Sequence, residues 1–298
     1  MLSSLLAVVA AGAFGRPGFA HPHPGGPEGR GGPGPDGEHP GAQWFRARVE
    51  AHVTDALDVA KATPEQRKAV QAEVDALLAK GKGGMDRHHQ QRKAAVEQFV
   101  ADKPDAKAIA VLVQQFVDTR LERAKDLAAA LTRLHPLFRP EQRKAIAGYV
   151  ADVVPAPRGS WQHKMARFWT DRMTDRAMDH LHCTAEQRRA LGAIREKVHG
   201  RMASVPTERR KHLDGALQLW QGDRLDAAAV QAHLDASAKH HKELAEFAVD
   251  QALEVHKVLT AEQRGKLAEF LRNHHGRRPH GGRHGGHGGP GGPAEGEE

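Results

Sequence analysis

The chain has few of the residues that stabilise small or β-rich folds. Of its 298 residues only Cys183 is a cysteine, so an internal disulfide is excluded. Aromatic residues make up 5% of the chain, and no alternating run of β-branched residues indicates a strand. No apolar segment approaches the roughly 20 residues that span a bilayer. These absences favour helices and predict a protein that is not membrane-spanning.

The motifs of common catalytic sites are also missing. The sequence has no phosphate-binding Gly-x-x-x-x-Gly-Lys-Ser/Thr loop, no Gly-x-Ser-x-Gly nucleophile turn and no His-Glu-x-x-His helix. Its carboxylates lie mainly among Lys and Arg, the ordinary pattern of a solvated helix. The net charge of +7 is distributed over many segments with both signs interleaved. We therefore expect neither an enzyme nor a nucleic-acid-binding protein.

What the chain contains instead is a repeated Glu-Gln-Arg motif. It occurs four times, with the glutamines at Gln66, Gln142, Gln187 and Gln263. Within each half these are 142 − 66 = 76 and 263 − 187 = 76 positions apart, and between halves 187 − 66 = 121 and 263 − 142 = 121. The same 121-residue offset aligns Phe99 with Trp220 and His135 with His256. Equal offsets indicate a tandem duplication of one unit, with two motifs in each copy.

Each motif predicts a helix start. In Thr63-Pro64-Glu65-Gln66 the Thr hydroxyl can accept from backbone amides, Pro64 suits the first helical position, and Gln66 can reach back to complete a capping box. In the second copy Arg139 stands where Thr is expected. The residues assigned to this motif are Thr63, Gln66, Arg67, Gln142, Arg143, Thr184, Gln187, Arg188, Thr260, Gln263 and Arg264.

The position before each cap is apolar or small. It is occupied by Ala62, Phe138, Cys183 and Leu259, and we expect it to be buried against the following turns.

The pattern of apolar residues and breakers divides the chain into six parts. Residues 1–20 have the short apolar core and small terminal residue of an export signal, which predicts a periplasmic or secreted protein. The other predicted parts are a disordered His/Pro/Gly arm at 21–41, a first unit at 42–154, a linker at 155–160, a second unit at 161–275 and a disordered Gly/His-rich tail at 276–298.

Glycine and proline predict the helix boundaries within the units. We expect helices at about 42–61, 64–80, 85–101, 105–134 and 140–153 in the first unit, and at about 161–182, 185–203, 207–221, 226–257 and 261–274 in the second. The predicted breakers of the first unit are Gly81, Gly83, Gly84, Pro104 and Pro136, and Pro206 and Gly222 are placed at turns of the second.

Leu259-Thr260-Ala261-Glu262-Gln263-Arg264, with its near copies, resembles the Leu-Thr-x-x-Gln motif of the Spy/CpxP family. The resemblance covers residues 42–275. It implies an all-α fold of two tandem helical-hairpin units, about four to five helices each. Family members pair into a curved cradle and carry the motif twice. This chain carries it four times, so we expect a fused pseudo-dimer. Such a chain could be a monomer or could form a homodimer.

The resemblance implies an ATP-independent periplasmic chaperone for partly unfolded envelope proteins. Two alternatives remain: a metal-binding sensor or buffer of the same fold, and a stress-signalling inhibitor that binds the periplasmic domain of a sensor kinase. Candidate client contacts, each also compatible with a place in the core, are Met85, Met165, Met173, Met178, Phe168 and Trp169.

The 21 histidines raise the question of metal binding. A chaperone of this kind requires no cofactor, but imidazoles in flexible segments can bind Zn, Cu or Ni. The candidate ligands are His21, His274, His275, His280, His284 and His287. Met178, His180, His182 and Cys183 also resemble a soft-metal cluster, although a buried structural role for Cys183 is favoured.

Overall fold

The computed structural model describes residues 40–153 and 161–274, and these ranges contain helices and no strand. The predicted all-α class is therefore confirmed for the described part of the chain. The helices are α2 (Pro40–Val59), α3 (Pro64–Val100), α4 (Ala106–Leu134), the 3-10 turn η1 (His135–Leu137), α5 (Pro140–Val153), α6 (Trp161–His180), α7 (Ala185–Gln221), α8 (Ala227–Val258) and α9 (Ala261–His274).

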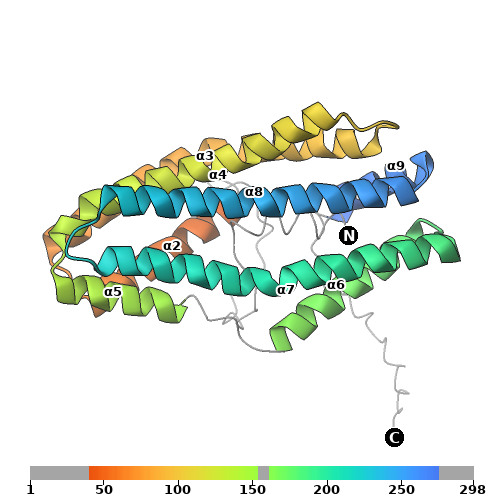
Figure 1. Cartoon of the computed structure of the whole chain (residues 1–298). Helices are drawn as coiled ribbons and strands as arrows, with labels where there is room; N and C mark the ends of the chain where they lie inside the picture. The colour runs from red at the N-terminus through yellow and green to blue at the C-terminus, as the bar shows by residue number, and fades with distance from the viewer. Residues whose placement is uncertain (1–39, 154–160, 275–298) are drawn as a thin grey trace, which may run out of the picture.

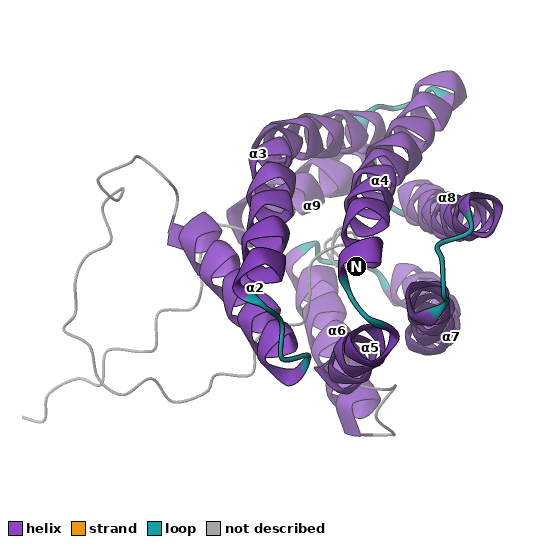
Figure 2. Cartoon of the chain, turned by 90° about the vertical axis from the view of Figure 1, so that its left-hand side faces the viewer, coloured by secondary structure: helices purple, strands orange, loops and turns teal. Residues whose placement is uncertain are grey.

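Two long helical hairpins form the body of the molecule. α3 and α4 make the hairpin of the first unit, and α7 and α8 make that of the second (Figure 1). α4 packs along α8, so the long helices follow the order α3, α4, α8, α7 around a curve (Figure 2). The short helices lie on the inner side of this curve, where α5 contacts α2 and α7 while α9 contacts α3.

The two units are related by a pseudo-two-fold axis. His135 Nε2 lies 3.0 Å from the carbonyl oxygen of Gly222, and His256 Nε2 lies 2.8 Å from that of Ala101. Both partners are displaced by the same offset, since 256 − 135 = 121 and 222 − 101 = 121. Each histidine also meets an aromatic ring edge-on, His135 on Trp220 and His256 on Phe99. The duplication seen in the sequence is therefore also a symmetry of the contacts.

Each unit's core includes a residue from the other unit. The first cluster of buried residues comprises Leu57, Ala62, Leu134, Phe138, Ala147 and Trp220. The second includes Met178, Cys183, Val255, Leu259 and Phe99, which lie at the equivalent positions, together with Ala177, Leu181, Leu191, Ile194, Leu267 and Phe270. Trp220 of α7 thus completes the first core and Phe99 of α3 the second. Because burial of a large aromatic side chain contributes several kcal/mol, about 3–5 on truncation, neither core is complete in one unit alone.

The long helices correct the predicted breaks. α3 continues through Gly81, Gly83 and Gly84, and α7 continues through Pro206. A glycine inside a helix costs only about 1 kcal/mol relative to alanine, and each long helix packs against its hairpin partner. Around Pro206, Arg201 donates from Nη1 to both carboxylate oxygens of Glu208 at 2.7 and 2.9 Å. This ion pair spans the turns in which the proline removes a backbone donor.

Candidate functional site

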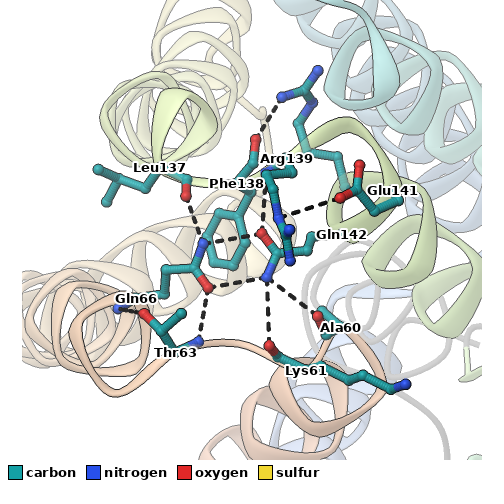
Figure 3. Close-up of polar contacts among 10 residues, drawn as sticks. Ala60, Lys61, Thr63, Gln66, Leu137, Phe138, Arg139, Glu141 and Gln142 are labelled. Carbon is teal, nitrogen blue, oxygen red and sulfur yellow. Dashed lines mark hydrogen bonds and ion pairs between the residues drawn. The ribbon is translucent and has the colours of Figure 1, made fainter.

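The first two motifs meet through their glutamines (Figure 3). Gln66 Nε2 donates to Gln142 Oε1 at 3.0 Å, and Gln142 Nε2 donates to Gln66 Oε1 at 3.1 Å. Gln66 Nε2 also donates to the carbonyl of Leu137 at 2.6 Å, and Gln142 Nε2 to that of Ala60 at 3.3 Å. The reciprocal amide pair therefore joins the start of α3 to the start of α5 across 76 residues.

The second unit repeats this arrangement. Gln187 Nε2 donates to Gln263 Oε1 at 2.8 Å, and the reverse bond from Gln263 measures 3.1 Å. The carbonyl acceptors are those of Val258 at 2.9 Å and Leu181 at 3.1 Å. These residues are the equivalents of Leu137 and Ala60, since 258 − 137 = 121 and 181 − 60 = 121. We call each reciprocal pair, Gln66–Gln142 and Gln187–Gln263, a glutamine clasp.

Threonine caps hold the clasp glutamines in place. The Thr63 hydroxyl accepts from the Gln66 amide at 3.3 Å, while Gln66 Oε1 accepts from the Thr63 amide at 2.8 Å. Thr184 with Gln187, and Thr260 with Gln263, make the same two bonds. The cap therefore fixes the Oε1 of each capping glutamine, and the Nε2 remains available to donate to the other motif.

The second motif keeps half of this box. Gln142 Oε1 accepts from the Arg139 amide at 3.0 Å. Arg139 has no hydroxyl to return the bond, and its guanidinium instead pairs with Glu141 at 3.2 Å on the surface (Figure 3). The departure seen in the sequence removes one capping bond without removing the clasp.

The motif arginines tie each helix start to the residue before its cap. Arg67 and Arg188 donate from Nε to the carbonyls of Ala62 and Cys183, both at 3.2 Å. Arg143 and Arg264 are buried and donate from Nη1 to Phe138 at 2.6 Å and Leu259 at 3.0 Å. The four acceptor residues are buried, as the sequence predicted. Burial is also the main reason why the pKa of the Cys183 thiol is raised.

The turns that precede the clasps are also equivalent. Lys61 and His182 both have a φ of 50°, in the left-handed region. The following amides, of Ala62 and Cys183, donate back to Leu57 and Met178 at 2.9 and 3.0 Å. This backbone reversal ends the preceding helix and places the threonine cap. Sequence reasoning missed the clasps themselves, although the identical 76-residue spacing in both halves was the signal for them.

The candidate client contacts divide between surface and core. Phe168 and Trp169 of α6 are 53% and 56% exposed and meet edge-on with ring centroids 6.0 Å apart. Met178 is buried and Met173 packs against the same core, which supports the structural reading for both. The side chains of Met85 and Met165 lie outside the described residues.

Most of the candidate metal ligands cannot be placed. His21, His275, His280, His284 and His287 lie outside the described residues, and His274 ends α9 with its side chain not described. Within residues 40–153 and 161–274, no group of three or more His, Cys, Asp or Glu is arranged to hold a metal ion. Cys183 and Met178 belong to the apolar core.

The fold and the clasps define a class: a duplicated helical-hairpin protein whose paired Thr-x-x-Gln motifs join the helix ends of each unit. The family model described as "LTXXQ motif family protein" matches residues 48–148 and again residues 169–271. The chain therefore belongs to the LTXXQ motif family, which is the Spy/CpxP family indicated by the sequence, and carries its unit twice. No curated protein and no solved structure matches significantly. Among the described residues, no helix is long and apolar enough to cross a membrane.

Proposed function

We propose that this protein is an exported, ATP-independent chaperone that acts in the periplasm. It would hold partly unfolded envelope proteins reversibly and without catalysis. Family membership supports the location and the non-enzymatic character. The observation that carries the client-binding role is the exposed pair Phe168–Trp169, because two adjacent large aromatic side chains at half exposure are unusual on a soluble surface and favour contact with apolar partners.

Ion pairs hold the segment of α6 that carries this aromatic pair against α7. Arg167 pairs with Glu196 of α7 at 2.7 Å, and Arg195 pairs with Asp171 at 3.3 Å. These contacts attach α6 to α7 on both sides of Phe168 and Trp169. Charged side chains thus flank the aromatic pair in the sequence, and the small size of the apolar contact would keep client binding weak enough to reverse.

The glutamine clasps supply the rigidity that such a surface needs. They fix the short end helices on the long hairpins through hydrogen bonds, in addition to the apolar packing of these helices in the two cores. Phe168 and Trp169 can stay exposed without weakening the core, because Ala177 and Met178 supply the contribution of α6 to it. Partner binding would then need no large rearrangement of the protein.

The test compares two double variants in an aggregation assay with a chemically unfolded model protein, followed by light scattering. We expect Phe168→Ser/Trp169→Ser to raise the amount of protein needed for half-suppression by about tenfold. The matched control is Val111→Ser/Leu127→Ser, which removes two side chains of α4 that are 54% and 50% exposed.

We expect the control to behave like the wild type. Equal suppression by the α6 variant and the wild type would contradict the proposed contact. Loss in the α4 variant alone would place the client surface on α4.

A further inference from the structure

Four histidines gather between α7 and α8. His212 of α7 lies with its ring centroid 6.0 Å from His233 and 5.1 Å from His240, and His240 lies 5.7 Å from His241. Neither the clasps nor the proposed client contact uses them. His240 Nδ1 faces the Glu208 carboxylate at 3.4 Å, while its Nε2 is buried without a hydrogen-bond partner.

The first unit shows what the same hairpin looks like without this cluster. At the 121-residue offset, His212 and His240 correspond to Gln91 and Thr119. There Gln91 Nε2 donates to Thr119 Oγ1 at 3.4 Å, so a neutral hydrogen bond replaces the contact between two imidazoles. The fold of the hairpin therefore does not require the histidines.

His241 of this cluster lies near the centre of the seam between the units. The cross-contacts Ala101–His256 and His135–Gly222 bracket the antiparallel packing of α4 on α8. Midway between residues 101 and 135 is position 118, and midway between 222 and 256 is position 239. His241 and its equivalent, Arg120, are two positions beyond these midpoints. The pseudo-two-fold axis thus brings an arginine of one unit near a histidine of the other.

The surroundings of the cluster are mainly positive. Arg120 of α4 stacks over Phe116, its guanidinium carbon 4.4 Å from the ring centroid. α7 contributes Arg201, Arg209, Glu208 and His212, and α8 contributes His233, His240 and Glu243. Glu208 is already bound by Arg201 at 2.7 and 2.9 Å. α3 meets the end of α8 through Phe99 and His256, 256 − 241 = 15 residues beyond the cluster.

Burial disfavours the protonated form of His233, His240 and His241, and neighbouring arginines add to this effect at His240 and His241. Burial, and then Arg120, lower the pKa of His241 from 6.5 to about 4. Burial also lowers the pKa of His233 and of His240, although Glu208 partly offsets the shift at His240. A proton on His240 Nε2 would leave a buried donor unpaired, and a proton on His241 would place a second cation beside Arg120.

We propose that the α4–α8 seam is proton-sensitive, so that protonation of His241 in acidic surroundings loosens the contact between the two units. Because the folded-state pKa values lie below that of a free imidazole, the unfolded chain binds more protons between about pH 6.5 and pH 4. The contribution of these histidines to folding stability is therefore constant above this window and falls as the pH falls through it. The inference does not depend on chaperone activity.

The direct test follows the histidine resonances of the full chain by NMR during a pH titration, with His241→Gln used for assignment. We expect His241 to titrate more than about one unit below a free imidazole. We also expect amide exchange in the central turns of α4 and α8, corrected for intrinsic rates, to rise as the pH falls. A His241 midpoint close to that of a free imidazole, or exchange that stays unchanged in acid, would overturn the proposal.

A second test uses variants that change the charge of position 241. Between about pH 7.5 and pH 5, the wild-type folding constant should fall about tenfold more than that of His241→Gln. His241→Arg, which copies the first unit, should lower stability already at neutral pH and flatten its pH dependence. The control is His89→Gln, which changes an exposed histidine of α3 and should preserve the wild-type slope. Parallel curves for wild type and His241→Gln would contradict the proposal.

Discussion

Replacing Gln142 with alanine tests whether the glutamine clasp holds the end helices in place. Gln142 is 3% exposed, and its Oε1 accepts from Gln66 Nε2 and from the Arg139 amide, both at 3.0 Å. Its Nε2 donates to Gln66 Oε1 at 3.1 Å and to Ala60 at 3.3 Å. The substitution removes these four bonds and a fifth, longer one from Nε2 to the carbonyl of Lys61 at 3.5 Å, and it leaves the carbonyl of the buried residue Ala60 without this donor.

The expected loss is about 2–4 kcal/mol of unfolding free energy. A typical hydrogen bond contributes about 1 kcal/mol net, and a buried group left without its partner costs about 1–3 kcal/mol. Arg139 is exposed and Gln66 is half-buried, so water can replace part of what they lose. The matched variant Gln263→Ala removes the equivalent bonds in the second unit, where the glutamine is less deeply buried, and should cost about 1–3 kcal/mol.

The assay is urea unfolding followed by far-ultraviolet circular dichroism, with Gln66→Ala and the double variant completing a cycle. We expect the double variant to lose about 1–2 kcal/mol less unfolding free energy than the sum of the two single losses, because each substitution alone already breaks both amide bonds. A Gln142→Ala variant within about 0.5 kcal/mol of the wild type, or an additive cycle, would show that the clasp does not hold the end helices in place.

Three further predictions concern the second cap, the shared cores and the histidine-rich tail. Arg139→Thr restores the missing capping hydroxyl and loses only an exposed ion pair, so the urea midpoint should rise by the equivalent of about 0.5–1 kcal/mol; an unchanged or lower midpoint would contradict the capping account. Residues 42–154 expressed alone lack Trp220, so they should form a homodimer in which Phe99 of each copy takes its place, and a folded monomer by size-exclusion light scattering would contradict the interlocked cores. We also propose that the histidines after residue 274 bind Cu or Zn, so calorimetric titration should show binding that deletion of 276–298 weakens at least about tenfold, whereas unchanged binding would refute this role of the tail.

The sequence was sufficient for the fold class and the duplication because both depend on repeated local signals. A capping threonine followed three residues later by a glutamine marks a helix start whatever surrounds it, and two equal offsets reveal a duplicated unit. The burial of Ala62, Phe138, Cys183 and Leu259 could be predicted for the same reason.

The helix breaks that were predicted wrongly, and the contacts that were not predicted, depend on packing between segments far apart in the sequence. Gly81 and Pro206 are local breakers, but each lies in a helix that packs along a long partner, and tertiary packing prevails over a penalty of about 1–3 kcal/mol. The clasps join residues 76 positions apart. The approach of Arg120 to His241 depends on how the two units pack, which no local pattern reports.

The measurement that tests the chaperone account most directly is aggregation of a chemically unfolded model protein, followed by light scattering. The protein would be the mature chain truncated after His275, with EDTA present. We expect suppression at near-stoichiometric amounts, because the helical body alone carries the proposed client contact. Absence of suppression, with activity appearing only when the full-length protein is supplied with Zn or Cu, would contradict it and favour a metal-dependent function.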